Sequence, residues 1–93
     1  MIMKKTRMLL ALALIAALLM GSALAAGYVE ASASVNVRSG PGTGNEVLDK
    51  IVGGTPVAIL EQTDNGWLRV RYITSTGSVG EGYVSADYVT VNS

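Results

Sequence analysis

Residues 59–72 read Ile-Leu-Glu-Gln-Thr-Asp-Asn-Gly-Trp-Leu-Arg-Val-Arg-Tyr, and this stretch decides the fold. Two runs that mix apolar and polar residues flank Asn65-Gly66, which is the strongest turn signal in the chain. Both turn residues accept positive φ angles, as a two-residue type I′ hairpin requires. The stretch therefore predicts a tight β-hairpin between two half-buried strands.

The register of this hairpin predicts which side chains face the core. A two-residue loop places Asp64 opposite Trp67, and directly opposed residues share one face of a sheet. We therefore expect a core face made of Val57, Ile59, Leu68, Val70 and Tyr72, with Glu61 and Thr63 near the turn. The solvent face then carries Ala58, Leu60, Gln62, Asp64, Trp67, Arg69 and Arg71. A slip of one residue would bury two arginines, which disfavours other registers.

Outward from the hairpin, the chain consists of short strands and turn residues, without an apolar repeat at helical spacing. Residues 39–45 hold three Gly and one Pro and predict a loop. Gly53-Gly54 predicts a two-residue hairpin turn. Further strands are expected at 35–38, 47–52, 56–63, 79–84 and 88–91, with one helical turn at 85–87. This pattern indicates an all-β fold, a small barrel or sandwich of five or six short strands.

The first 25 residues have the pattern of a secretory signal peptide. Lys4, Lys5 and Arg7 precede an apolar run over 8–20, and Ala23-Leu24-Ala25 follows as a small-residue cleavage motif. We expect cleavage before Ala26, within two residues, and a flexible N-terminal segment over 26–34. The alternative is an uncleaved membrane anchor, because the run to Ala26 is just long enough to span a bilayer. In either case the remainder is expected to be exported, to the extracellular space, the cell wall or the periplasm.

Composition excludes several classes of function. Three of the seven basic residues lie in the first 25 positions, so the rest carries four basic and seven acidic residues, a formal charge of −3. A negative domain is unsuited to neutralising phosphates, so we expect no nucleic-acid partner. The chain has no Cys and no His, which excludes disulfides, thiol chemistry and His-based triads. We expect no metal and no cofactor.

Four sequence motifs resemble the bacterial SH3-like (SH3b) domain. Val35-Asn36-Val37-Arg38-Ser39-Gly40-Pro41 is similar to the opening strand of that family. The other similar segments follow in family order: Val47 to Gly54, Asn65 to Val70, and Gly82-Tyr83-Val84 followed by Ala86 to Val89. The resemblance covers residues 35–91. One departure is Tyr83, where the family usually has Trp.

The resemblance implies a small SH3-like β-barrel and a binding role. Domains of this family usually accompany cell-wall hydrolases and are thought to bind peptidoglycan, often its peptide stems or cross-bridges. We therefore expect a secreted, monomeric, bacterial binding module for peptidoglycan or its peptides. The alternative is a protein–protein interaction domain that binds an extended peptide or an envelope partner, including as a membrane-tethered sensor.

Five residues are candidates for the ligand-binding site: Arg38, Asn45, Trp67, Tyr83 and Tyr88. Aromatic side chains can stack on sugar rings or peptide side chains, and a planar guanidinium suits a carboxylate. Each candidate also has a structural interpretation. Trp67 could cover the barrel mouth, the two tyrosines could be wall residues, and Arg38 could hydrogen-bond loop carbonyls or pair with Asp87 or Glu46.

We expect no enzymatic activity. Glycoside hydrolysis needs two carboxyl groups held across a sugar-sized cleft. Asp64 and Glu61 lie near one turn, but the predicted register places them on opposite faces. The seven carboxylates are therefore expected to form a solvated surface, and catalytic residues are expected to be absent.

Overall fold

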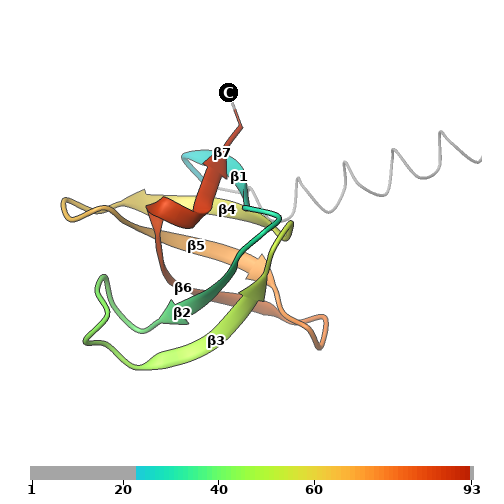
Figure 1. The fold of residues 1–93 in the computed structure, drawn as a ribbon, viewed down its shortest axis with the longest axis horizontal. Coiled ribbons are helices and arrows are strands. Elements are labelled where there is room, and N and C mark those ends of the chain that lie inside the picture. Colours follow the sequence, from blue (N-terminus) through green and yellow to red (C-terminus); the bar gives the residue numbers. More distant parts are fainter. Residues whose placement is uncertain (1–22, 93) are drawn as a thin grey trace, which may run out of the picture.

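The computed structural model describes residues 23–92 as one curled antiparallel sheet (Figure 1). Its elements are β1 (Ala25–Val29), β2 (Ser34–Arg38), β3 (Val47–Val52), β4 (Pro56–Gln62), β5 (Trp67–Ile73), β6 (Val79–Ser85), the 3-10 turn η1 (Ala86–Tyr88) and β7 (Val89–Val91). The strand order is β3-β2-β6-β5-β4-β1-β7. The all-β prediction is confirmed, and the seven strands exceed the predicted five or six because β1 was not foreseen.

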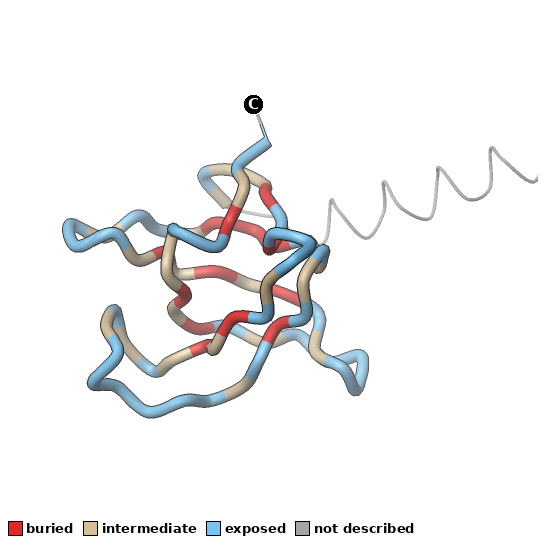
Figure 2. The backbone as a smooth tube through the Cα atoms, in the orientation of Figure 1, coloured by how far each residue is buried: buried red, intermediate tan, exposed pale blue. Residues whose placement is uncertain are grey.

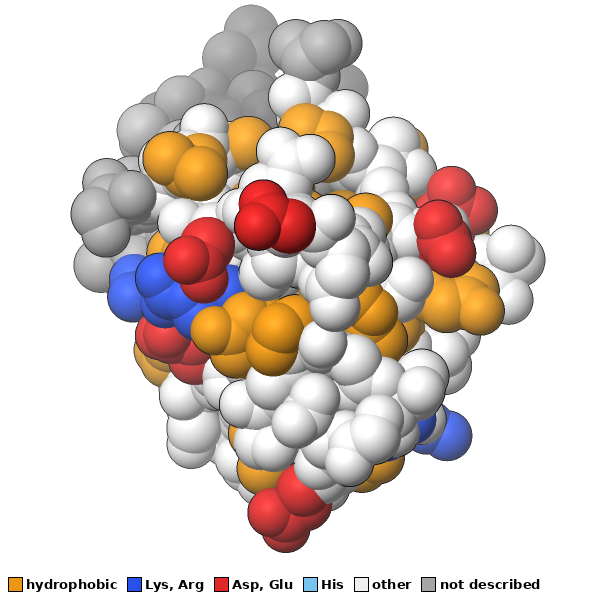
Figure 3. Space-filling model, turned by 90° about the vertical axis from the view of Figure 1, so that its left-hand side faces the viewer, with side chains coloured by type: hydrophobic (Ala, Val, Ile, Leu, Met, Phe, Trp, Pro, Cys, Tyr) orange, Lys and Arg blue, Asp and Glu red, His pale blue; other side chains and the backbone are white. Residues whose placement is uncertain are grey.

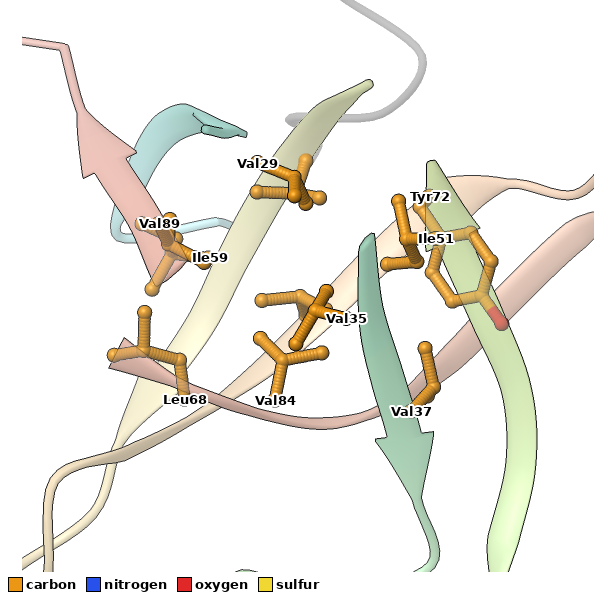
Figure 4. Close-up of a cluster of buried hydrophobic side chains, with 11 residues drawn as sticks. Val29, Val35, Val37, Ile51, Ile59, Leu68, Tyr72, Val84 and Val89 are labelled. Atoms are coloured by element: carbon orange, nitrogen blue, oxygen red, sulfur yellow. The ribbon is translucent and has the colours of Figure 1, made fainter. Parts of the chain in front are cut away.

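The core lies inside the curl, and every strand contributes to it. Figure 2 shows the buried positions concentrated in the centre of the fold, and Figure 4 shows their side chains pointing toward one another. The buried hydrophobic residues are Val29, Val35, Val37, Ile51, Val57, Ala58, Ile59, Leu68, Val70, Tyr72, Val84 and Val89. Most are β-branched, and such side chains pack well on a pleated surface. No polar or charged residue in 23–92 is buried.

The β4–β5 hairpin has a different register from the one predicted. Thr63 N–H donates to the Trp67 carbonyl at 2.9 Å, and Gln62 lies opposite Leu68. The loop therefore has three residues, 64–66, and only Gly66 has a positive φ angle, of 81°. A type I turn followed by a left-handed glycine is the usual form of a three-residue loop, so the type I′ prediction is wrong.

A β-bulge preserves the predicted core in spite of this shift. The register changes again between Ile59 and Glu61, so that Ile59 opposes Val70 and Glu61 opposes Arg69. All five residues predicted for the core face are buried. Glu61 was expected on that face, but the extra residue of the bulge turns it outward, where its carboxylate meets Arg69.

Gly53-Gly54 forms a turn but not a hairpin. β3 pairs with β2, whereas β4 pairs with β5 and β1. A Cβ atom at Gly53 would lie 2.3 Å from the Ala33 carbonyl oxygen, and Gly54 N–H donates to the Val29 carbonyl at 2.7 Å. The two glycines therefore carry the chain tightly past the β1–β2 connection to the other side of the sheet.

The segment expected to be flexible, 26–34, instead holds most of β1. β1 pairs with β4 along one edge and with β7 along the other, and Val29 is fully buried. The scarcity of large apolar residues predicted a flexible segment, but the small residues fit the narrow space between two strands. A Cβ atom at Gly27 would lie 2.5 Å from the Thr90 carbonyl oxygen. Residues 25–29 therefore belong to the folded domain and do not form a flexible segment.

The predicted signal peptide falls largely outside the described residues. Only its last three positions, 23–25, are described, and Ala25 already belongs to β1. Between residues 23 and 92 there is no helix of the length and apolar character needed to cross a bilayer.

Candidate binding cleft

An open cleft of about 440 Å³ lies at one end of the sheet, between β2, the 39–46 loop, the start of β5 and η1. We call it the β2–η1 cleft. Its lining residues are Ser34, Val35, Asn36, Arg38, Thr43, Trp67, Ser85, Asp87 and Tyr88. Figure 3 views the end of the molecule at which the 39–46 loop and the β4–β5 turn project, and hydrophobic side chains emerge there between polar loops.

The path of β2 explains why a cleft opens here. β2 pairs with β3 along its length, but with β6 only through Arg38 and Tyr83. Val35 and Val37 are buried, so the alternate residues Ser34, Asn36 and Arg38 face outward. These outward side chains form one wall of the cleft, opposite the elements that carry Trp67 and Tyr88.

Arg38 holds the 39–46 loop in place. Its Nη1 atom donates to the carbonyl oxygens of Thr43 at 2.9 Å and Asn45 at 3.0 Å. This is the loop-carbonyl interpretation considered from the sequence, and within residues 23–92 no ion pair joins Arg38 to Asp87 or Glu46. A guanidinium carries five N–H groups, so the remaining donors can still bind a ligand in the cleft.

Asn45 and Asn65 order the loop rather than line the cleft. Asn45 Nδ2 donates to the Gly42 carbonyl at 3.2 Å, within the loop. Asn65 Nδ2 donates to the Pro41 carbonyl at 3.0 Å and so joins the β4–β5 turn to the loop. Asn45 does not line the cleft, so its role as a ligand contact stays a prediction. The bridging role of Asn65 was missed because the sequence indicated only its turn conformation.

Trp67 is half-buried and lines the cleft at the first position of β5. Thr63 fixes its backbone: the Thr63 Oγ1 atom accepts from Trp67 N–H at 3.2 Å and donates to the Trp67 carbonyl at 2.8 Å. This position corresponds to the structural interpretation considered from the sequence, in which Trp67 covers one end of the barrel. Part of its ring is available to a ligand.

Tyr88 and Asp87 reach the cleft from η1. Ser85 Oγ accepts from Asp87 N–H at 3.3 Å, which caps the turn, and Ala86 N–H donates to the Gly66 carbonyl at 2.9 Å. Tyr88 is 49% exposed. Asp87 was considered only as a partner for Arg38, yet it adds a carboxylate to the same cleft.

Tyr83 is not brought into the cleft. It lies on β6 between Arg38 and Arg69 in the registers of the two neighbouring strands, and it does not line the cleft. The structure thus assembles three of the five predicted site residues, Arg38, Trp67 and Tyr88.

The shifted pKa values lie away from the cleft. A hydrogen bond from the Tyr72 hydroxyl, 2.8 Å from Asp49 Oδ2, and one from the Lys50 N–H hold the pKa of Asp49 below its ordinary value. Burial, with the neighbouring Asp49, raises the pKa of Tyr72. Contact with Glu81 at 2.6 Å raises the pKa of Arg69. In 23–92 no three His, Cys, Asp or Glu side chains gather as a potential metal site.

The fold and the cleft define a small SH3-like β-barrel domain with an aromatic and charged surface cleft. The sequence model of the bacterial SH3 domain family matches residues 33–90 of this chain. The chain therefore belongs to this family.

Curated relatives contain a similar segment. A Bacillus subtilis protein described as an N-acetylmuramoyl-L-alanine amidase, YrvJ, is 38% identical over 56 residues, covering 60% of this chain and 10% of the amidase. Proteins described as endopeptidase p60 are 39% identical in Listeria innocua and 38% in Listeria monocytogenes, over 60% of this chain and 11% of each. The chain thus matches about a tenth of the length of these relatives, and the match falls within the SH3 domain.

Proposed function

We propose that the chain is an exported, non-catalytic and monomeric binding module whose β2–η1 cleft binds peptidoglycan through its peptides. The observation that carries this proposal is the composition of the cleft, in which an indole, a phenol, a guanidinium and a carboxylate share one open surface. The family supports it, since the relatives are described as an amidase of N-acetylmuramoyl-L-alanine and as endopeptidases.

The chemistry of the cleft suits a short peptide with charged groups of both signs. The free donors of Arg38 can bind a carboxylate in a planar arrangement. Asp87 is exposed and can accept hydrogen bonds from an ammonium group. Trp67 and Tyr88 provide apolar surface for the intervening chain, because aromatic rings combine large contact area with little flexibility. Among residues 23–92, Asp87 is the one carboxylate that lines the cleft, and this supports a non-catalytic role because glycoside hydrolysis requires a pair.

Co-sedimentation with insoluble peptidoglycan tests the proposal. Residues 23–93 keep β1 intact and should sediment in a saturable manner. Asp87→Asn should weaken sedimentation, whereas Asp64→Asn, which changes another exposed carboxylate at the β4–β5 turn outside the cleft, should not. Trp67→Ala and Tyr83→Ala form a second matched pair, with circular dichroism to confirm folding.

The outcomes separate the two functional classes. Loss confined to the cleft variants supports wall binding through the β2–η1 cleft. Absence of sedimentation by folded wild type contradicts the proposal and leaves the alternative, a module that binds an extended peptide or an envelope protein. Equal loss in both members of each pair contradicts the assignment of the cleft.

A further inference from the structure

The expected processing site lies inside a strand of the folded domain. Cleavage before Ala26 breaks the Ala25–Ala26 peptide bond, and both residues belong to β1. Along one edge, Ala25 is paired with Ile59 and Ala26 with Ala58 of β4. Leu24, on the leader side of the bond, donates its N–H to the Ile59 carbonyl at 2.8 Å. The backbone on both sides of the bond is thus engaged with β4.

The other edge of β1 is engaged as well. The Ala26 carbonyl accepts from the Asn92 N–H at 2.9 Å, and Gly27 lies opposite Val91 in β7. Gly27 is packed so closely that a Cβ atom there would lie 2.5 Å from the Thr90 carbonyl oxygen. Val29, two residues further on, is fully buried in the core. β1 therefore cannot leave the sheet without exposing core surface and breaking pairs on both sides.

A protease that recognises an extended substrate hydrogen-bonds to the same backbone groups that strand pairing uses. In the folded domain these groups around the scissile bond are already occupied. We propose that folding of the domain closes the processing site, so that the leader is removed only while β1 is undocked. A precursor that folds first keeps its leader. This inference rests on the exported nature of the chain that is part of the proposed function.

The consequence is two forms of one binding domain. Cleavage before folding yields a released domain that begins at Ala26, with its cleft on η1 and β2 unchanged. Folding before cleavage yields a domain that remains attached to its apolar leader. The order of two events, rather than a difference in sequence, then decides between the secreted and the tethered form.

The test treats the purified full chain, in detergent micelles, with bacterial signal peptidase. The wild-type precursor is compared with Gly27→Val, which cannot dock β1 against Thr90 but retains the Ala23-Leu24-Ala25 motif. Gly44→Val is the matched control, because no atom lies within 4 Å of a Cβ atom placed there. Mass spectrometry measures the appearance of the 26–93 product, and circular dichroism and Trp67 fluorescence report folding.

Cleavage of folded wild type and of Gly44→Val should be ~100-fold slower than cleavage of Gly27→Val, since cutting must wait for opening of a small domain. Synthetic peptides spanning 18–32 with Gly or Val at position 27 should be cut equally fast, which excludes a direct effect on the enzyme. Cleavage of folded wild type at the rate of Gly27→Val overturns the proposal. Failure to cut any chain or peptide overturns it together with the signal-peptide assignment, whereas peptidoglycan sedimentation tests the cleft separately.

Discussion

Arg38 and Asp87 line the same cleft but differ in what else they contact. Arg38 donates to two loop carbonyls, whereas no side chain among residues 23–92 donates to the Asp87 carboxylate. We predict that Arg38→Ala lowers the free energy of unfolding by about 1 kcal/mol, the usual size for a lost hydrogen-bonding group, and also weakens ligand binding. Asp87→Asn should weaken binding alone. Urea unfolding checks the first effect, and equal stability losses in both variants would contradict it.

The Tyr72–Asp49 hydrogen bond predicts a pH-dependent contribution to stability. The pKa of Asp49 is depressed chiefly by the Tyr72 hydroxyl, so the ionised carboxylate is the form that stabilises the fold. This contribution is present above the unfolded-state pKa and is lost as the pH falls below about 4. Tyr72→Phe should therefore be less stable than wild type at pH 7, and the gap should narrow at pH 3. Urea midpoints at both pH values measure it, and an unchanged gap would contradict the assignment.

At the residue scale, the sequence predicted the cleft in part. Arg38 and Trp67 lie next to strong turn signals in a motif with known family order, so their location could be inferred. The place of Asp87 in the cleft could not be inferred in this way. Asp87 lies in the 3-10 turn η1, and the position of η1 near Trp67 depends on a tertiary contact, the hydrogen bond from Ala86 N–H to the Gly66 carbonyl. The position of Tyr83 outside the cleft could not be inferred, because alternation along β6 does not show which face the neighbouring β2 leaves open.

β1 is the element whose importance the sequence concealed. It supplies the partner for both β4 and β7, and its single large buried residue is Val29. Val29→Ala should cost roughly 2 kcal/mol, because it removes core contacts and leaves a cavity. Tyr28→Ala, at the adjacent and exposed position, should change stability by less than about 0.5 kcal/mol. Chemical denaturation of both variants checks the pair, and comparable losses would contradict the placement of β1.

The β2–β6 junction, which borders the cleft, depends on Gly82. A Cβ atom there would lie 2.4 Å from Val37 Cγ1 and 3.0 Å from the Arg38 carbonyl oxygen. Gly82→Ala should therefore destabilise the domain by ~1–3 kcal/mol through overpacking. Gly44→Ala, with open space around it, is the control. Thermal unfolding measures both, and a neutral Gly82→Ala variant would show that β2 can move away without cost.

At the element scale, strand positions were predictable and strand partners less so. β3 was predicted with its observed bounds, because β-branched residues and flanking glycines mark it clearly. The pairing of β3 was not predicted. Gly53-Gly54 resembles a hairpin turn that would pair β3 with β4, but tertiary packing places β4 on the other side of the sheet. The bulge at Leu60, between Ile59 and Glu61, could not be predicted either. It keeps the predicted core residues buried, because burial of apolar side chains outweighs one ideal turn geometry.

Across residues 23–92 as a whole, β3 and β7 are the two edge strands of the curled sheet. β3 exposes Val47, Leu48 and Val52, which would favour edge-to-edge association. Asp49 Oδ1 accepts from the Lys50 N–H at 2.7 Å, which occupies one backbone donor of this strand. Together with the Lys50 charge, this arrangement disfavours pairing of the β3 edge with a strand of another chain.

For the proposed wall-binding function, the charge of the domain predicts which wall component it binds. Beyond residue 25 the chain carries seven acidic and four basic residues, so anionic polymers are repelled at low salt. Removing anionic polymers from cell-wall preparations should leave sedimentation unchanged or increase it. The sedimented fraction before and after extraction measures this effect. A sharp decrease after extraction would identify the polymers, rather than the peptides, as the ligand.

Chemical-shift mapping of the ¹⁵N-labelled domain during titration with soluble peptidoglycan peptides shows directly whether the β2–η1 cleft is the binding site. We predict saturable shifts concentrated at Arg38, the Trp67 indole, Asp87 and Tyr88, with Tyr83 and the β3 edge unaffected. Shifts centred on β3, or no shifts at saturating peptide concentration, would contradict the β2–η1 cleft as the binding site.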